Sequence, residues 1–311
     1  MKFELTILGS GSSIPTSNRN SAAQVLHVLG RYFLIDCAEA TQPQLRRFHV
    51  PYNKINHIFI SHLHGDHFFG LIGFLSTLSL QGRRGEMHIY AEPRLQELIG
   101  CQMKILHSRF TFPLFFHALS RREEVIYEDK VVTVTAFPLK HHYDTPVSGF
   151  LFREKERERT ILKDRTAAWN VPIAFMQYLK RGEDFITPEG EIVANELLTV
   201  APPPARSFAY MTDTLFRERF ADYVRGVDLL YHEATYMNAD AVLAKESYHS
   251  TTGQAARIAE LAGVGKLLLG HFSARYTECS ELLAEAREVF PNTFLCSDGD
   301  FFEVPAVKRR S

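Results

Sequence analysis

Short apolar runs alternate with turn-forming residues along most of this chain, a pattern that is typical of an α/β protein. Runs rich in β-branched and aromatic residues predict strands, and two longer segments with helical spacing predict helices over 70–80 and 252–262. Gly9–Ser13 separates the first strands as a flexible loop. The predicted strands lie at 3–8, 22–28, 32–35, 55–60, 87–90, 131–137, 208–211, 229–232, 266–269 and near Phe294.

The middle of the chain interrupts this alternation. Residues 152–181 hold eight basic and four acidic side chains, and they include the single tryptophan, Trp169. Strands and helices on both sides predict one layered α/β domain, 1–311, built of two halves at about 1–151 and 197–311. Residues 152–196 are then an inserted arm, which we expect to dock the substrate.

Composition narrows the class of protein further. The 311 residues are 45% hydrophobic, and 35 basic residues nearly balance 36 acidic ones, which excludes a wholly basic nucleic-acid-coating protein. The four cysteines are scattered without a CxxC pair, so we expect reduced thiols and a cytoplasmic protein. Neither a signal peptide nor a membrane span is expected. Histidine is unusually frequent, with 14 copies.

The strongest chemical signal is the run His62-Leu63-His64-Gly65-Asp66-His67, directly after the strand at 55–60. His62 and His64 lie on one side of an extended segment, while Gly65 lets the chain turn so that Asp66 and His67 can serve a second ion. Imidazole and carboxylate ligands without thiolate suit a catalytic zinc. The alternative is a polar turn whose histidines cap a helix.

Six residues cannot complete two four-coordinate sites, so further ligands are needed. The candidates follow other apolar strand patterns, where polar side chains would meet at the sheet edge. They are His141 or His142, Asp213 and His271. Each alone is as compatible with a merely hydrogen-bonded side chain, and it is the recurrence of the pattern that favours ligands.

These motifs resemble those of the metallo-β-lactamase superfamily and, more narrowly, of the ribonuclease Z family in its short form. The resemblance covers nearly the whole chain. It rests on Leu8-Gly9-Ser10-Gly11, Asp36–Gln42, the histidine motif, Pro138–His141, Tyr210–Thr214, His232–Thr235, His249–Thr251 and Gly270–Ser273, in that order.

The resemblance implies a four-layer αβ/βα metallo-β-lactamase sandwich with a protruding arm, a homodimer, and two Zn²⁺ ions per chain, with manganese or magnesium as substitutes. His62, His64 and His141 would hold one ion, Asp66, His67 and His271 the other, and Asp213 would bridge them. The implied reaction removes the 3′ trailer of precursor tRNA, leaving a 3′-hydroxyl on the tRNA and a 5′-phosphate on the trailer. Asp66 would act on the water, and His249, supported by Glu233, would protonate the departing oxygen; without the resemblance, Glu233 and His249 read as a capping pair.

Three departures from the family pattern stand out. Two glycines of the DCGEGTQ segment are alanines here, Ala38 and Ala40, so this loop is expected to follow a different path. Adjacent histidines occupy 141 and 142, and the Pro-Leu-x-His pattern selects His141. The arm has no Gly-Pro pair; Val171-Pro172-Ile173-Ala174 stands there instead.

The arm supplies the substrate hypothesis. Arg157, Arg159, Lys163 and Arg165 could bind phosphates, and Trp169, Phe175 and Tyr178 could stack on bases. Alternating Arg and Glu is equally typical of a solvated ribbon. Two other functions remain open: a hydrolase of a small phosphodiester or thioester, which would not need the arm, and a non-catalytic RNA-binding module, which filled ligand positions disfavour.

Overall fold

The computed structural model describes residues 2–142 and 144–304, in which the chain forms two compact units. The main unit contains the chain up to Arg153 and again from Arg206, and the inserted unit is Glu154–Ala205. No helix among these described residues combines the length and apolar character that crossing a membrane requires.

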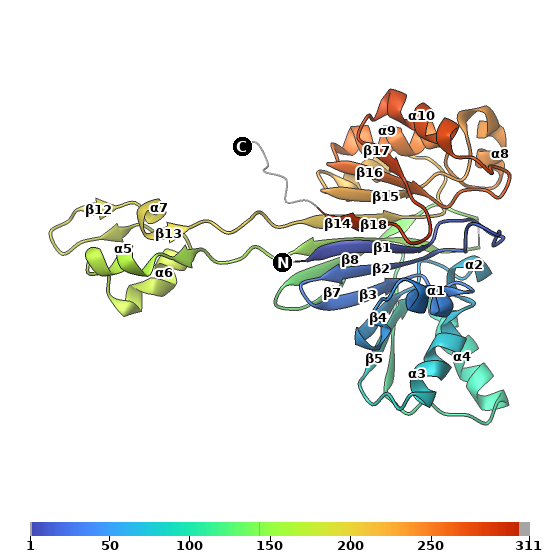
Figure 1. The fold of residues 1–311 in the computed structure, drawn as a ribbon, viewed down its shortest axis with the longest axis horizontal. Helices are drawn as coiled ribbons and strands as arrows, with labels where there is room; N and C mark the ends of the chain where they lie inside the picture. Colours follow the sequence, from blue (N-terminus) through green and yellow to red (C-terminus); the bar gives the residue numbers. More distant parts are fainter. Residues whose placement is uncertain (1, 143, 305–311) are drawn as a thin grey trace. The chain divides into compact units, whose positions relative to one another are not determined.

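Two seven-stranded mixed sheets lie at the centre of the main unit (Figure 1). The first has the order β18-β1-β2-β3-β4-β5-β6 and the second the order β17-β16-β15-β14-β9-β8-β7. The strands are β1 Phe3–Gly9, β2 Ala23–Val28, β3 Arg31–Ile35, β4 Ile55–Phe59, β5 Met87–Ala91, β6 Leu114–Ala118, β7 Glu124–Glu128, β8 Val132–Leu139, β9 Val147–Glu154, β14 Ser207–Met211, β15 Leu229–Glu233, β16 Lys266–Gly270, β17 Thr293–Leu295 and β18 Phe301–Glu303.

Helices cover the outer face of each sheet, so the layers run helix, sheet, sheet, helix (Figure 1). Between the sheets the buried rings of Phe33 and Phe152 lie with centroids 5.5 Å apart. This arrangement confirms the expected αβ/βα sandwich. The main-unit helices are α1 Thr41–Arg47, α2 Gly65–Phe68, α3 Leu71–Leu80, α4 Arg94–Ile105, α8 Ala241–Glu246, α9 Thr252–Ala262 and α10 Ser280–Val289, with short 3₁₀ turns η1 Tyr52–Lys54, η3 Glu218–Val224 and η4 Asn238–Asp240.

Helix α9 has the bounds that its sequence predicts, because both of its ends are specified locally. Thr251 Oγ1 accepts a hydrogen bond from Gln254 N–H, and the Gln254 side chain accepts one from Thr251 N–H, which forms a capping box. Gly263 ends the helix with a φ of 62°, a conformation that glycine adopts without steric cost.

The loop after β1 is fixed by hydrogen bonds, which corrects the expectation of a flexible segment. The Ser10 N–H and hydroxyl donate to Asp298 Oδ1 at 3.0 and 2.8 Å. Ser12 N–H donates to the carbonyl of Phe272 at 3.0 Å. These bonds place Ser13 next to the histidine motif.

The inserted unit has a small core of its own, formed by Val171, Leu179, Phe185, Val193 and Leu198. Phe152 and Arg153, which the sequence assigned to the arm, instead pair with Phe208 and Ser207 of β14 in the main unit. The unit's elements are β10 Thr160–Ile161, α5 Lys163–Ala168, η2 Ile173–Phe175, α6 Met176–Lys180, β11 Phe185–Ile186, β12 Ile192–Val193, α7 Asn195–Leu198 and β13 Thr199–Val200.

Candidate metal centre

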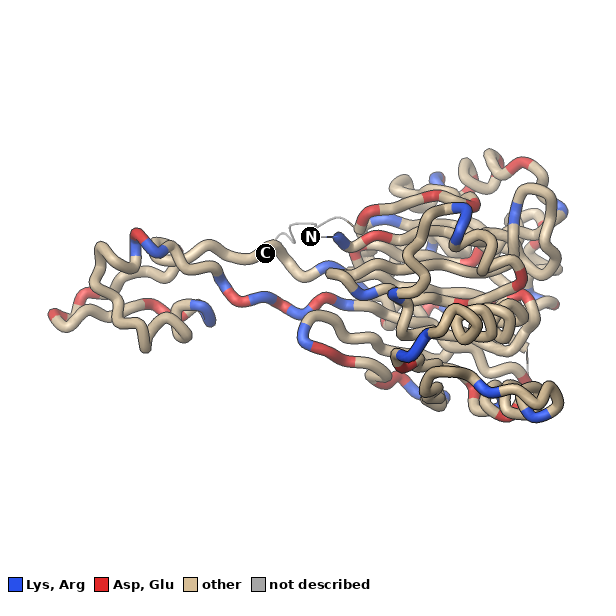
Figure 2. The backbone as a smooth tube through the Cα atoms, turned by 60° about the horizontal axis from the view of Figure 1, so that its bottom comes forward, with Lys and Arg blue, Asp and Glu red and all other residues tan. Residues whose placement is uncertain are grey.

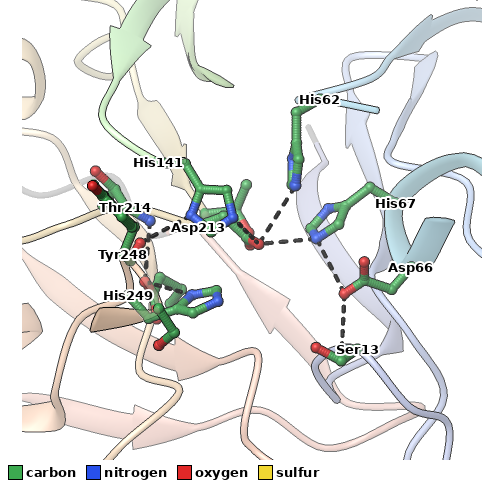
Figure 3. Close-up of polar contacts among 12 residues, drawn as sticks. Ser13, His62, Asp66, His67, His141, Asp213, Thr214, Tyr248 and His249 are labelled. Atoms are coloured by element: carbon green, nitrogen blue, oxygen red, sulfur yellow. Dashed lines mark hydrogen bonds and ion pairs between the residues drawn. The ribbon is translucent and has the colours of Figure 1, made fainter. Parts of the chain in front are cut away.

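Seven His and Asp side chains of the main unit lie close together. Figure 3 labels five of them: His62, Asp66, His67, His141 and Asp213. The buried strand β4 leads into His62, and α2 carries Asp66 and His67. His64 lies between them, directly before α2. The other three members follow β8, β14 and β16, so residues far apart in sequence converge where these strands end. The seven are His62, His64, Asp66, His67, His141, Asp213 and His271.

Asp213 lies between two groups of these ligand atoms. Its Oδ2 is 3.5 Å from His62 Nε2 and 3.9 Å from His141 Nε2. Its Oδ1 is 3.3 Å from His67 Nε2 and 3.2 Å from His271 Nε2. Each oxygen of one carboxylate therefore faces a different pair of imidazoles, as a carboxylate that bridges two metal ions would have to do.

The ligand atoms fall into compact groups in which all atoms lie within 4.8 Å of one another. One group is His62, His64, His141 and Asp213, and another is Asp66, His67 and His271. A third, overlapping group adds His249 to Asp213 and His271. His249 is thus close enough to be a ligand as well as a proton donor.

A hydrogen-bond partner on Nδ1 orients four of the imidazoles. His67 Nδ1–H donates to Asp36 at 2.7 Å and His141 Nδ1–H to the carbonyl of Tyr248 at 2.9 Å. Ser61 Oγ accepts from His62 at 3.0 Å, and Thr235 Oγ1 from His271 at 3.1 Å. With Nδ1 engaged in this way, the Nε2 atom of each of these rings is directed at the cluster, as metal binding requires.

The supporting residues Asp36, Ser61, Thr235 and Tyr248 received no role in the sequence analysis. Asp36 also accepts from the Tyr210 hydroxyl at 2.8 Å and from the Ser61 hydroxyl at 2.9 Å. Asp36 and Thr235 lie within the quoted family segments, so the signal for them was present. The Tyr248 carbonyl carried none, because backbone atoms leave no mark in a sequence.

The residues fit a divalent metal. His62 Nε2 is buried and has no hydrogen-bond partner among the described residues. Burial is the main cause that lowers the pKa of His62 well below its usual value, so this side chain is a neutral donor. Burial would likewise lower the pKa of His67, but Asp213, Asp66 and Asp36 together raise it well above the usual value. These three carboxylates therefore stabilise a positive charge placed among them. Nitrogen and oxygen ligands without sulfur suit zinc or a similar ion.

Local backbone conformations support these positions. Asp36, Asp213 and His271 have φ angles of 55°, 25° and 60°, which non-glycine residues rarely adopt and which concentrate at functional sites. A Cβ on Gly70 would lie 2.0 Å from the Ala38 carbonyl oxygen, so glycine is required where the two motif segments touch. Cys37 N–H and the His67 carbonyl join the same segments at 2.8 Å.

A pocket of about 390 Å³ opens onto the cluster, lined by Ser13, His64, Asp66, His141, His142, Asp213, Ser247 and His249. Ser13 N–H donates to Asp66 Oδ2 at 2.8 Å, so the loop after β1 orients this carboxylate (Figure 3). His141 is buried within the cluster, whereas His142 is exposed at the rim. The His64 side chain does not cap α2, which argues against the alternative of a helix-capping turn.

Glu233 and His249 form a buried pair beside the cluster. His249 Nδ1–H donates to Glu233 Oε1 at 3.2 Å. Burial alone would lower the pKa of His249, but Glu233 outweighs it and raises the pKa to about 9. Glu233 also accepts from the N–H groups of Thr214 and Ser250, at 3.1 and 2.7 Å, so it anchors two loops as well as His249.

The basic residues expected to dock substrate lie in the inserted unit, and carboxylates of that unit engage two of them. Arg157 contacts Glu154 at 3.3 Å, and Arg159 contacts Glu196 at 3.9 Å. Lys163 and Arg165 are exposed and form no salt bridge with a described residue. Basic and acidic residues alternate along the segment that enters the unit (Figure 2). Counted over 154–205, seven basic residues stand against nine acidic ones, so the basic excess belongs only to the first part.

The aromatic residues of the inserted unit contribute mainly to its core. Trp169 and Phe175 pack against that core, and Tyr178 is 38% exposed. The expectation that all three rings are free to stack on bases therefore reduces to Tyr178.

Comparisons with known proteins agree with this geometry. The metallo-β-lactamase fold protein YhfI from Bacillus subtilis superposes with a TM-score of 0.68 at 19% identity, covering 97% of this chain and 98% of that one. Human tRNase Z, short form, superposes with a TM-score of 0.69 at 27% identity, covering 97% of this chain and 99% of that one. The fold and the clustered side chains define a protein of the metallo-β-lactamase fold with His and Asp groups that could hold a metal ion.

Sequence relatives narrow this class. Ribonuclease Z of Bacteroides fragilis (strain YCH46) is 46% identical over 298 residues, covering 96% of this chain and 97% of the relative. Ribonuclease Z of Porphyromonas gingivalis (strain ATCC BAA-308 / W83) is 40% identical over 297 residues, covering 95% and 97%. A family model described as Anti-Pycsar protein Apyc1 matches residues 3–168. The chain belongs to the ribonuclease Z family and, over residues 3–168, to the family of that model.

Proposed function

We propose that this chain is a metal-dependent endoribonuclease of the ribonuclease Z type that removes the 3′ trailer of precursor tRNA. The observation that carries the proposal is the position of Asp213, whose two oxygens face two separate pairs of imidazoles. We assign His62, His64 and His141 to one ion, Asp66, His67 and His271 to the other, and Asp213 to both. The ions are two Zn²⁺ per chain, with manganese or magnesium as substitutes.

Bound divalent metal supplies positive charge to the phosphate oxygens and makes a bound water acidic enough to react near neutral pH. The protein supplies the orientation. Ser13 N–H donates a hydrogen bond to Asp66 Oδ2 and so fixes this carboxylate. In this position Asp66 orients the attacking water and accepts its proton. The phosphorus is attacked in line, so the 3′ oxygen departs with the tRNA and the phosphate stays on the trailer.

The departing 3′ oxygen needs a proton, and His249 is placed to donate it. Glu233 Oε1 holds Nδ1–H, which leaves Nε2 for the leaving group. A pKa of about 9 keeps the imidazole protonated at neutral pH, as a general acid must be. Glu233 therefore acts as a positioning residue for His249.

The inserted unit is proposed to dock the tRNA body, with Lys163 and Arg165 as its available cations and with Arg157 and Arg159 already engaged by carboxylates. Such contacts bind phosphates and weaken with salt. We further propose a homodimer. On α4, Leu98 and Ile105 lie seven residues apart on one helix face and are 39% and 70% exposed, which supports an interface there. Light scattering of the wild type and of a Leu98→Lys/Ile105→Lys variant tests the dimer.

We place the reaction in the cytoplasm, because Cys37, Cys101, Cys279 and Cys296 are all free thiols.

A hydrolase of small phosphodiesters, which would need the metal centre but not the inserted unit, is the second candidate. Incubation with end-labelled precursor tRNA and with a chromogenic phosphodiester, each with and without chelator, separates the two. The proposal expects chelator-sensitive cleavage at the trailer junction. Turnover of the chromogenic ester with intact precursor tRNA would favour the alternative.

A further inference from the structure

A second, smaller pocket lies beside the candidate metal centre and shares His141 and His142 with it. Its volume is about 130 Å³, against about 390 Å³ for the pocket over the cluster. The loop between β6 and β7 contributes Arg121, and the loop after β8 contributes Lys140. The two pockets therefore adjoin at His141 and His142.

The lining suits an anion attached to a flat apolar group. Arg121 and Lys140 carry positive charge, and no Asp or Glu lines the pocket among the described residues. Arg121 is exposed and forms no salt bridge with a described residue, so its guanidinium is available to a ligand. Pro138 and Pro146 supply apolar surface in the same pocket. A phosphate with its attached nucleoside has this combination of properties.

The size of the pocket distinguishes a subsite from an independent binding site. Pockets that bind a whole small molecule measure roughly 300–1,000 Å³, which this pocket does not reach. It can hold only one part of a ligand that is anchored elsewhere. The shared residues His141 and His142 place that anchor at the metal centre.

We propose that this pocket binds the nucleotide next to the scissile phosphate, with that nucleotide's phosphate on Arg121 and Lys140. The inference rests on the proposed function, since it extends an RNA chain from the metal centre. A small phosphodiester has no adjacent nucleotide and does not use the pocket. Arg121 is thereby a specificity-determining residue for polymeric substrates.

The loop itself provides a matched control, because Arg122 is the next residue, is also exposed and does not line the pocket. Arg121→Ser is expected to raise KM for precursor tRNA by about 5-fold and to reduce the slope of log KM against log salt by about 0.7, the contribution of one single-strand phosphate contact. Arg122→Ser leaves both unchanged. Arg121→Lys, which keeps the charge, restores the salt slope, and all three variants hydrolyse a chromogenic phosphodiester like the wild type.

A competition assay keeps this test independent of the natural substrate. A uridine trinucleotide and uridine monophosphate are compared as inhibitors of chromogenic turnover. The trinucleotide is expected to inhibit the wild type and Arg122→Ser more strongly, and Arg121→Ser should lose this advantage. If the trinucleotide inhibits Arg121→Ser as strongly as it inhibits Arg122→Ser, the proposed subsite is wrong. If the enzyme leaves precursor tRNA uncleaved but the trinucleotide still inhibits Arg121→Ser less than Arg122→Ser, only the proposed function is wrong.

Discussion

The candidate metal centre and the inserted unit use their charged residues in opposite ways. In the centre, Asp213 and His67 are buried and are held so that their free atoms face a common point. In the inserted unit, Arg157 and Arg159 lie near the surface and are paired with carboxylates of the same unit. His and Asp residues that follow strands therefore indicate a buried site from the sequence alone. A basic residue indicates a docking surface only if no neighbouring carboxylate pairs with its charge.

The largest effect is expected where the two ligand groups meet. Asp213→Ala removes both bridging oxygens, and we expect roughly a 10³-fold loss of kcat, since metal charge stabilises the transition state by several kcal/mol. The number of metal ions per chain, close to two in the wild type, should be lower in this variant. Full activity in this variant, or one ion per saturated wild-type chain, would contradict a bridged pair.

His249 tests whether every member of the cluster is a ligand. If His249 is the general acid, the His249→Ala variant should cleave RNA about 100-fold more slowly. The nitrophenolate that leaves a chromogenic phosphodiester needs no donated proton, so turnover of that substrate should change little. Metal content should also change little if His249 is not a ligand. Loss of metal together with both activities would instead make His249 a ligand.

The pH dependence of RNA cleavage gives the same acid a second signature. Because the pKa of His249 is raised to about 9, its protonated form is present below that pH and is lost above it. Glu233→Gln removes the carboxylate that raises this pKa, so the alkaline limb of kcat should move to lower pH. A profile that does not move would remove Glu233 from this role.

In the inserted unit, basic residues that are paired with carboxylates should contribute less to RNA binding than basic residues that are not. Lys163→Ser/Arg165→Ser should raise KM for precursor tRNA by about 10-fold, because unpaired charges contribute most to phosphate binding. Arg157→Ser/Arg159→Ser, whose cations contact Glu154 and Glu196, should have a smaller effect. Chromogenic turnover and melting temperature serve as controls. Equal effects would show that the internal ion pairs open when RNA binds.

The smallest effect concerns the altered loop next to the metal motif. Ala40 has a φ of 66°, where alanine is strained and glycine is not, so Ala40→Gly should raise the free energy of unfolding by about 0.5–1 kcal/mol. Ala38 has no positive φ, and Ala38→Gly should lower that free energy by a similar amount. Thermal melts of the two variants distinguish strain at this one residue from a general effect of glycine.

The strands and helices that position the centre could be predicted because each is specified by local pattern, as in β4, β16 and α9. Convergence of His141, Asp213 and His271 was also within reach, since all three follow apolar runs. The pattern missed α4 and β9, and with β9 it missed the fact that Phe152 belongs to the core sheet. Charge pairing in the inserted unit was beyond reach because Glu196 meets Arg159 only after the unit folds.

The hydrogen bonds around Asp298 have a consequence for the order of assembly. Asp298 accepts from Ser10 and Asn20, and β18 pairs with β1, so the last strand of the second half closes the first sheet. The loop fixed in this way carries Ser13, which orients Asp66. During synthesis on a ribosome, the histidine motif emerges before Asp298, so the loop that orients Asp66 is fixed only after Asp298 has been made. A chain without Asp298 would keep the histidines but would lose the hydrogen bonds that fix this loop.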